Sequence, residues 1–125
     1  MKQKCLLPND EFYELPNTKL LEIFEKGLLL ERGRALFVLA RRSGENKDIT
    51  HIVVKQIYDS NNRNTRTIGI ASISFLGIAG LLEADTNDTK ETVKNILELW
   101  AEPDRSNLIL FLQSTYQSAF ISSII

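Results

Sequence analysis

The sequence predicts an all-α fold in which six helices form three antiparallel pairs, and three observations lead to this prediction. Apolar residues recur at the helical period, as in Leu20, Ile23 and Phe24. Residues that begin or end helices, such as Pro16 and Gly27, separate the apolar stretches. The same arrangement of apolar, acidic and basic residues also returns three times along the chain.

Length and composition are those of one globular domain, which we expect to cover residues 1–125 without a disulfide or a metal. The chain has 125 residues, of which 43% are hydrophobic and 25% are charged. Cys5 is the single cysteine and His51 the single histidine, which excludes a disulfide framework and the usual zinc and His-paired metal sites. Pro8 and Asp10 interrupt the N-terminus, so it has no signal-peptide hydrophobic region and we expect a cytoplasmic protein.

The first predicted pair covers about residues 17–43 and follows an N-terminal extension of residues 1–16. Pro16 and the two residues after it open the first helix, and Gly27 can end it. The second helix of the pair is then expected over about residues 28–42.

The second predicted pair covers about residues 48–84. A turn is expected at residues 43–46, after which Asp48 can cap the first helix. Residues 60–64 are predicted to form a loop, and an uncharged helix is expected from about residue 65 to 84.

Residues 51–59 and 67–75 have a rival interpretation as strands, because both stretches are rich in β-branched residues. Ile68 and Ile70 alternate in one phase, and Ile73 and Phe75 alternate in the other. A strand cannot change phase without a bulge, whereas a helix buried on all sides needs no fixed phase. The sequence therefore favours a helix, with an α+β fold and a generic helical bundle as the alternatives.

The third predicted pair covers about residues 88–121. Asp88 and Glu91 form an Asp-x-x-Glu variant of the capping box at its start. The first helix is expected to end near Pro103, and Ser106 is the expected N-cap of the last one.

The C-terminal segment carries no charge from residue 106 onward, although a terminal repeat normally has a polar outer face. The segment is too polar for a membrane helix, and the uncharged residues 67–82 are too few, so no membrane partner is expected. Two alternatives stay open for the apolar end: a homodimer through the C-terminal helix, or a tail folded back on its own core. The residues concerned are Phe120, Ile121, Ile124 and Ile125.

The repeat is clearest when the chain is aligned on three arginines, which are 34 and 39 residues apart. In each copy, apolar residues stand 12, 9 and 8 positions before the arginine and, with one glycine, 3, 4 and 7 positions after it. An acidic residue stands seven positions before each arginine. Each copy therefore describes a helix, a short acidic turn and a second helix opened by an arginine. The arginines are Arg32, Arg66 and Arg105, and the acids are Glu25, Asp59 and Glu98.

This pattern resembles the HEAT repeat of the α-solenoid superfamily, over about residues 17–112. The resemblance implies three repeats, at about 17–43, 48–84 and 88–121, stacked as a short right-handed α-solenoid. It also implies a hydrogen-bonded ladder between neighbouring repeats, with the three arginines as donors and the three acids as candidate acceptors. Three features depart from the family. The acid stands further from the arginine, and the usual proline of the first helix is missing. The valine that usually precedes the arginine is replaced by Glu31, Thr65 and Asp104. A tetratricopeptide array stays open as an alternative because the spacing of 34 residues fits it.

No group of residues has the pattern of a catalytic or cofactor site, so we expect neither an enzyme nor a cofactor. His51 has no second histidine or cysteine near it, and the run from Asp85 to Thr89 lacks the glycine of a calcium loop. The resemblance implies instead a non-catalytic protein-binding module, because helical repeats present one row of helices as a binding surface. A short array suits one dedicated partner, such as a toxin neutralised by an inhibitor or immunity-type protein.

The charge pattern suggests two kinds of partner. Net charge is −1, but residues 32–66 carry eight Lys or Arg against three Asp or Glu, between two acidic blocks. The acidic blocks would dock a basic toxin-like enzyme. Nucleic acid on the basic block is the alternative, and the near-neutral net charge argues against it. The protein-partner hypothesis names Asp85, Asp88, Glu91, Arg41 and Arg42; the nucleic-acid alternative names Arg34, Arg41, Arg42, Lys47, Lys55, Arg63 and Arg66.

Overall fold

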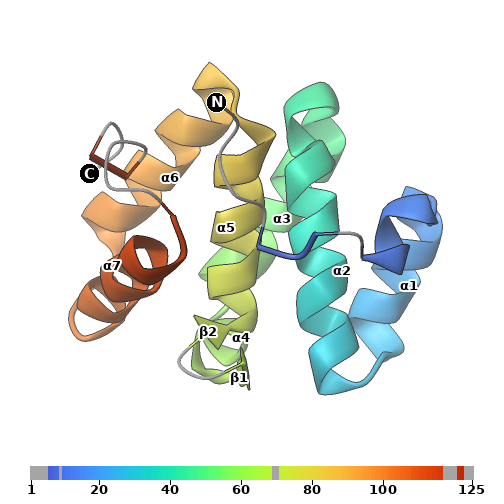
Figure 1. Cartoon of the computed structure of the whole chain (residues 1–125), viewed down its shortest axis with the longest axis horizontal. Coiled ribbons are helices and arrows are strands. Elements are labelled where there is room, and N and C mark those ends of the chain that lie inside the picture. Colours follow the sequence, from blue (N-terminus) through green and yellow to red (C-terminus); the bar gives the residue numbers. More distant parts are fainter. Residues whose placement is uncertain (1–5, 9, 69–70, 117–120, 123–125) are drawn as a thin grey trace.

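The computed structural model describes residues 6–8, 10–68, 71–116 and 121–122, and over these residues the chain is predominantly helical (Figure 1). This confirms the predicted predominance of helices. The α-helices are α1 (Asn17–Lys26), α2 (Leu29–Arg42), α3 (Lys47–Tyr58), α4 (Ser60–Asn64), α5 (Ile73–Ala84), α6 (Asn87–Leu99) and α7 (Asp104–Thr115). Two short 3-10 helices, η1 (Glu11–Glu14) and η2 (Ser43–Glu45), and the strands β1 (Arg66–Ile68) and β2 (Ala71–Ser72) complete the described elements.

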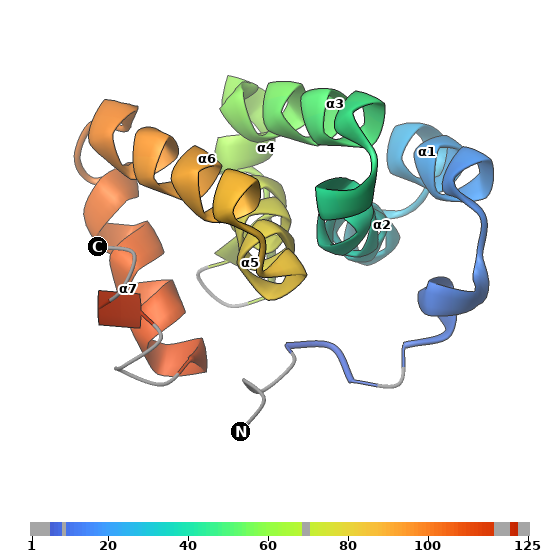
Figure 2. The same ribbon diagram turned by 90° about the horizontal axis from the view of Figure 1, so that it is seen from above.

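The helices lie in two rows when the molecule is seen from above (Figure 2). One row contains α1, α3 and α6, and the other contains α2, α5 and α7. The most extensive contact between two elements joins α2 to α5, and α5 also packs against α3 and α6. Every residue from Ile73 to Leu82 is buried, which explains why this helix carries no polar face.

A single cluster of buried side chains forms the core, and it draws on both rows of helices. The approach of α2 to α5 depends on Gly80, because a Cβ there would lie 2.4 Å from the main-chain oxygen of Phe37. Burying one large aliphatic side chain contributes about 1.5–3 kcal/mol to stability. The fully buried large side chains include Leu20, Phe37, Ile57, Leu81, Ile96 and Leu108.

The ends of the first pair agree with the sequence prediction within a residue, but the N-cap of α3 was predicted wrongly. Asn46 caps this helix, since its Oδ1 accepts from the main-chain nitrogens of Asp48 at 2.9 Å and Ile49 at 3.3 Å. Asp48 therefore lies in the first turn, because the cap must be the residue that still has extended backbone.

The caps of the third pair also differ from prediction. Thr86 and Thr89 form the capping box of α6, each main-chain nitrogen donating to the other hydroxyl at 3.1 Å, so Asp88 and Glu91 are not the box. Helix α6 ends at Leu99, and α7 begins two residues before Ser106. Pro103 is the N-cap, so Ser106 lies in the first turn, where its main-chain nitrogen donates to Glu102 Oε1 at 2.9 Å.

Residues 60–84 depart most from the sequence prediction. The expected loop is helix α4, which Asp59 caps by accepting from Asn61 N at 2.8 Å. The six predicted helices correspond to α1, α2, α3, α5, α6 and α7, so α4 is an additional helix. The expected long helix begins only at Ile73, because β1 and β2 pair as an antiparallel hairpin before it. The change of apolar phase marks this transition from strand to helix, so the α+β alternative was correct for the hairpin alone.

Described residues near both ends of the chain pack on the core. Phe12 in η1 and Ile121 after α7 are buried in the core cluster, at 6% and 3% exposure. The described part of the C-terminal tail thus folds onto its own core, as one of the two alternatives expected; Phe120, Ile124 and Ile125 lie outside the described residues. Among the described residues, no helix combines the length and apolar character needed to cross a bilayer.

Candidate functional site

Arg32 and Arg105 make the same contact in the first and third helix pairs. Each donates from Nε to a main-chain oxygen eight residues earlier, Phe24 O at 2.8 Å and Leu97 O at 2.9 Å. The acceptors lie in the last turns of α1 and α6, so each bond ties the start of the second helix to the end of the first. Arg66 makes no such contact because it lies on β1 with an exposed side chain.

The acid-to-arginine ladder that the resemblance implied is not formed among the described residues. Glu25 and Glu98 are exposed, and neither joins an ion pair found in this part of the chain. Asp59 instead caps α4. The arginines at two of the three positions bind main-chain oxygens within their own pair, where they need no acid as acceptor.

The N-terminal strap, which we define as the described residues 6–8 and 10–16, crosses α5 and α2 on the side of the second row of helices (Figures 1 and 2). Phe12 anchors it in the core. A hydrogen bond within the strap stabilises it, since the Tyr13 hydroxyl donates to Leu7 O at 2.8 Å. The strap therefore covers the face of α2 that carries three arginines.

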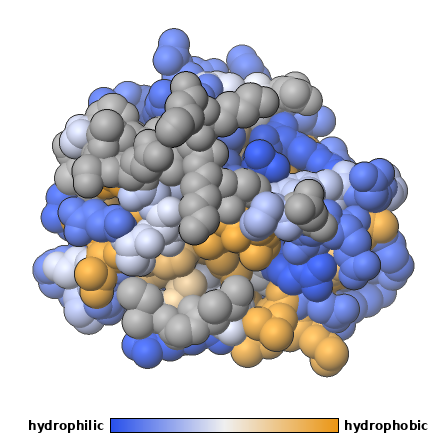
Figure 3. All heavy atoms as spheres, in the orientation of Figure 1, coloured by the Kyte–Doolittle hydropathy of each residue, from blue (hydrophilic) through white to orange (hydrophobic). Residues whose placement is uncertain are grey.

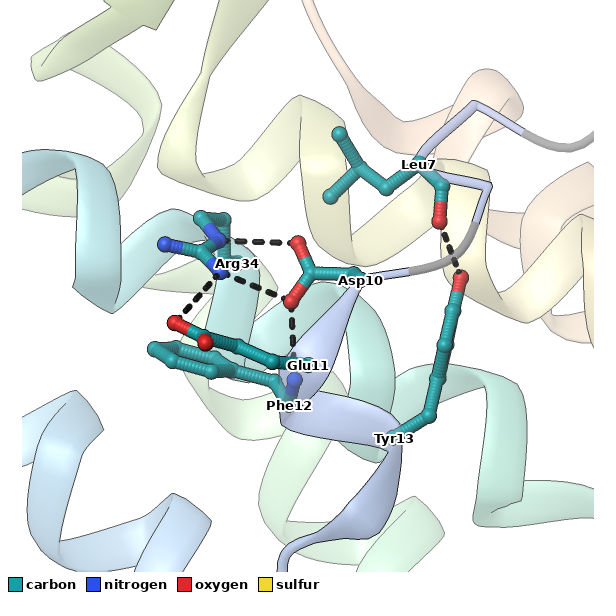
Figure 4. A network of polar contacts seen from close by, with 6 residues as sticks. All are labelled: Leu7, Asp10, Glu11, Phe12, Tyr13 and Arg34. Atoms are coloured by element: carbon teal, nitrogen blue, oxygen red, sulfur yellow. Dashed lines mark hydrogen bonds and ion pairs between the residues drawn. The ribbon is translucent and has the colours of Figure 1, made fainter.

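Arg34 holds the strap at Asp10 and Phe12 (Figure 4). Its Nε and Nη2 donate to Oδ2 and Oδ1 of Asp10, both at 2.8 Å, and the guanidinium lies 4.0 Å from the centre of the Phe12 ring. The hydrogen bond from Arg34 is the main reason that the pKa of Asp10 lies below its ordinary value. Such a two-pronged bond fixes the carboxylate in orientation as well as in position.

Arg41 and Arg42 also bind the strap, so two residues predicted to contact a partner are engaged within the chain. Arg42 donates to Tyr13 O at 2.8 Å and to Leu15 O at 2.7 Å. Arg41 lies 5.1 Å from the centre of the Tyr13 ring. Neither arginine is free for another protein while the strap is in place.

Glu83 joins three distant parts of the chain at the end of α5. Its Oε2 accepts from Leu6 N at 2.9 Å and from the Tyr116 hydroxyl, and its Oε1 lies 3.2 Å from Nε of Arg41. Only 4% of its side chain is exposed. A buried carboxylate requires such partners, because an unpaired charge in the interior is costly.

The acidic residues predicted to bind a partner come together at the turn between α5 and α6. Asp85 adopts a left-handed backbone, with φ of 56°, and pairs with Lys90 at 2.8 Å. Asp88 and Glu91 are exposed and join none of the ion pairs found among the described residues. We call these three acids the acidic edge.

A groove of about 470 Å³ lies next to the acidic edge, between η2, α3 and α6. Asp88 lines one side of it, and Lys47 and the exposed His51 line the other. The sequence did not identify this groove, since its walls come from segments far apart in the chain. The remaining lining residues are Ser43, Gly44, Thr50, Val54 and Thr89.

Sequence reasoning also missed an exposed apolar surface between α1 and α2. We call Leu28, Leu29 and Leu30 the leucine turn; their exposed fractions are 77%, 42% and 53%. Figure 3 shows an apolar patch at this edge of the molecule. The signal was present in the sequence, because three consecutive leucines cannot all face the same side of a helix.

The described residues show no cluster that could hold a metal ion, since no three His, Cys, Asp or Glu side chains converge among them. Cys5 lies outside the described residues. The candidate surfaces are therefore the acidic edge with its groove, the strap-covered arginines and the leucine turn. Comparison with protein-family models, with curated proteins and with solved structures finds no match to this chain.

Proposed function

We propose that this protein is a non-catalytic module that binds another protein, and that its leucine turn is the contact surface. The supporting observation is the exposure of three consecutive leucines beside a well-packed core. Contiguous exposed apolar side chains often mark interaction sites. Covering one exposed leucine completely is worth about 1.5–3 kcal/mol, so a partner at this turn gains several kilocalories per mole before the costs of association.

The charges around the leucine turn suit a partner with an apolar patch and a mixed polar rim. In the sequence, Glu25 and Lys26 precede the leucines, and Glu31 and Arg32 follow them. Glu31 also fixes the turn, because its Oε1 accepts from Leu28 N at 3.0 Å. The leucines are thus presented from a capped helix start rather than from a loose loop.

The arrangement of helices supports the proposal of stacked pairs. Taken as pairs, α1–α2, α3–α5 and α6–α7 would form a short α-solenoid of three repeats. The two rows of helices and the matching bonds of Arg32 and Arg105 favour this interpretation. Helical-repeat proteins commonly bind partners along such surfaces.

A basic partner at the acidic edge is a second candidate, which corresponds to the inhibitor or immunity-type function. The exposed carboxylates of Asp88 and Glu91 favour it. Such a site would steer a basic enzyme electrostatically, so its association would slow as salt rises. A nucleic-acid function has less support, since Arg34, Arg41 and Arg42 bind the strap.

Affinity capture from the native host with matched variants tests the proposal. The tagged wild-type chain, Leu28→Ser/Leu30→Ser and Leu110→Ser would be compared by quantitative mass spectrometry; Leu110 is 56% exposed on α7 and serves as the control. We expect one protein to be lost with the leucine-turn variant and retained with the control.

A fourth sample separates the two protein-binding candidates. Loss of the partner with Asp88→Lys/Glu91→Lys, but not with Leu28→Ser/Leu30→Ser, would favour the acidic edge. Equal recovery with every variant, or recovery of no partner by the wild-type chain, would contradict the leucine-turn proposal.

A further inference from the structure

The strap is bound to α2 around the 3-10 turn η1, through two kinds of contact. Arg42 binds the main-chain oxygens of Tyr13 and Leu15. These contacts do not depend on which side chains the strap carries, because every residue has a carbonyl. Arg34 instead binds the side chain of Asp10 and lies against Phe12, so it distinguishes one sequence from another.

Asp10 and Phe12 form one recognition unit around a single guanidinium group (Figure 4). Both oxygens of Asp10 are bound at 2.8 Å, and the ring of Phe12 lies 4.0 Å away. The fork of an arginine matches the two oxygens of a carboxylate, and its flat face stacks on an aromatic ring. A lysine provides neither the fork nor the flat face. Arg34 therefore selects an acid followed two positions later by an aromatic residue.

Side chains of the helices hold the strap: Glu83 and the three arginines bind its polar groups, and its apolar residues pack against the core cluster. Among the described residues the strap pairs with no strand, and the backbone is extended at Asp10 and Leu15 on either side of η1. Phe12 is the only described strap residue that is buried. Terminal segments held in this way open at a lower free energy than the helices that they cover. The strap can thus leave while α2 and α5 stay packed.

We propose that Arg34, Arg41 and Arg42 form a peptide-binding site that the strap occupies in the isolated chain, and that a partner protein binds there through a segment that forms the same short turn. That segment carries an acidic residue and, two positions later, an aromatic one. The site uses other residues than the leucine turn and goes beyond the function assigned to that turn. The attached strap competes at a high effective concentration, so the site binds a second segment weakly until the strap is loosened.

A fluorescent synthetic peptide of residues 6–16 tests the site in the full-length chain. Asp10→Asn in the chain removes the carboxylate to which Arg34 donates two hydrogen bonds. The change loosens the strap while leaving Phe12 in place. We expect this chain to bind the peptide about tenfold or more tightly than the wild-type chain does, as measured by anisotropy. Phe12→Leu in the chain provides a second opened form, which keeps an apolar anchor in the core. Thermal unfolding, followed by circular dichroism, shows whether each variant is folded.

Two controls assign the binding to the arginine face. A peptide with Asp10→Asn should bind none of the chains, and adding Arg34→Lys to the opened chain should return its affinity to that of the wild type. The proposal is overturned if neither folded variant gains affinity, if the control peptide binds equally, or if Arg34→Lys has no effect. A wild-type dimer in light scattering that dissociates when the strap peptide is added would also overturn it, because the occupant would then be a second copy.

Discussion

Arg32 and Arg105 occupy equivalent places in two helix pairs and donate the same hydrogen bond to the chain eight residues before them. Each bond satisfies a main-chain oxygen in the last turn of the preceding helix, which would otherwise lack a partner. The same kind of contact thus joins α1 to α2 and α6 to α7. It joins helices of one pair, whereas the ladder implied by the resemblance would join neighbouring pairs.

Arg32→Gln and Arg105→Gln should each lower the free energy of unfolding by about 1–2 kcal/mol, because each removes a charge-assisted bond to a main-chain oxygen. Urea unfolding measures the change. Arg66→Gln is the matched control, since Arg66 is exposed on β1, and it should stay within about 0.5 kcal/mol of the wild type. Equal effects at all three positions would contradict the structural distinction between them.

Asp10→Asn should destabilise the chain at neutral pH by about 1 kcal/mol, a value reduced for the partial exposure of Arg34. The pKa of Asp10 is lowered in the folded state, mainly by the bond from Arg34. Its contribution to stability is therefore complete above the unfolded-state pKa and is lost as the pH falls through the lower folded-state pKa. Urea midpoints for wild type and variant should differ at pH 7 and converge below about pH 4. A constant difference across that range would contradict the assignment.

Glu83→Ala should lower the free energy of unfolding by about 3 kcal/mol, because it leaves Arg41 without its buried partner. It should also increase hydrogen exchange near Leu6 and Tyr116, which both donate to this carboxylate. Glu91→Ala is the control, since Glu91 is exposed on α6. Similar stability of the two variants would show that the junction at Glu83 is dispensable.

Gly80→Ala should destabilise the protein by about 1–3 kcal/mol, since a Cβ there would lie 2.4 Å from Phe37 O and 2.6 Å from Ala40 Cβ. The clash with main-chain atoms forces α2 and α5 apart rather than moving a flexible side chain. Asn95→Ala, at an exposed position of α6, is the control for thermal unfolding. An unchanged melting temperature for Gly80→Ala would contradict the close contact of α2 and α5.

Local signals predicted the parts of the fold that depend on nearby residues. Pro16 and Gly27 bound α1 because a proline suits the start of a helix and a glycine its end. The hairpin was missed because strands of two or three residues have too short a pattern to recognise. Ile68 and Ile73 did show a change of phase, but the simpler long helix was preferred.

The candidate site was less predictable, because its partners are distant in the sequence. Nothing near Arg41 and Arg42 indicates that residues of the N-terminal extension will bind them. Asp88 and Glu91, which the sequence singled out as partner contacts, are exposed, as polar residues in the first turns of a helix usually are. The leucine turn was missed because its residues were assigned only to the start of the second helix.

Site-specific photocrosslinking tests the central claim, that a partner protein covers the leucine turn, most directly. A photoreactive phenylalanine analogue would replace Leu28 in the native host, and Leu110 in a control. We predict a crosslink to one other protein from position 28 and none to that protein from position 110. Crosslinks that are the same from both positions, or no crosslink to another protein from position 28, would contradict the claim.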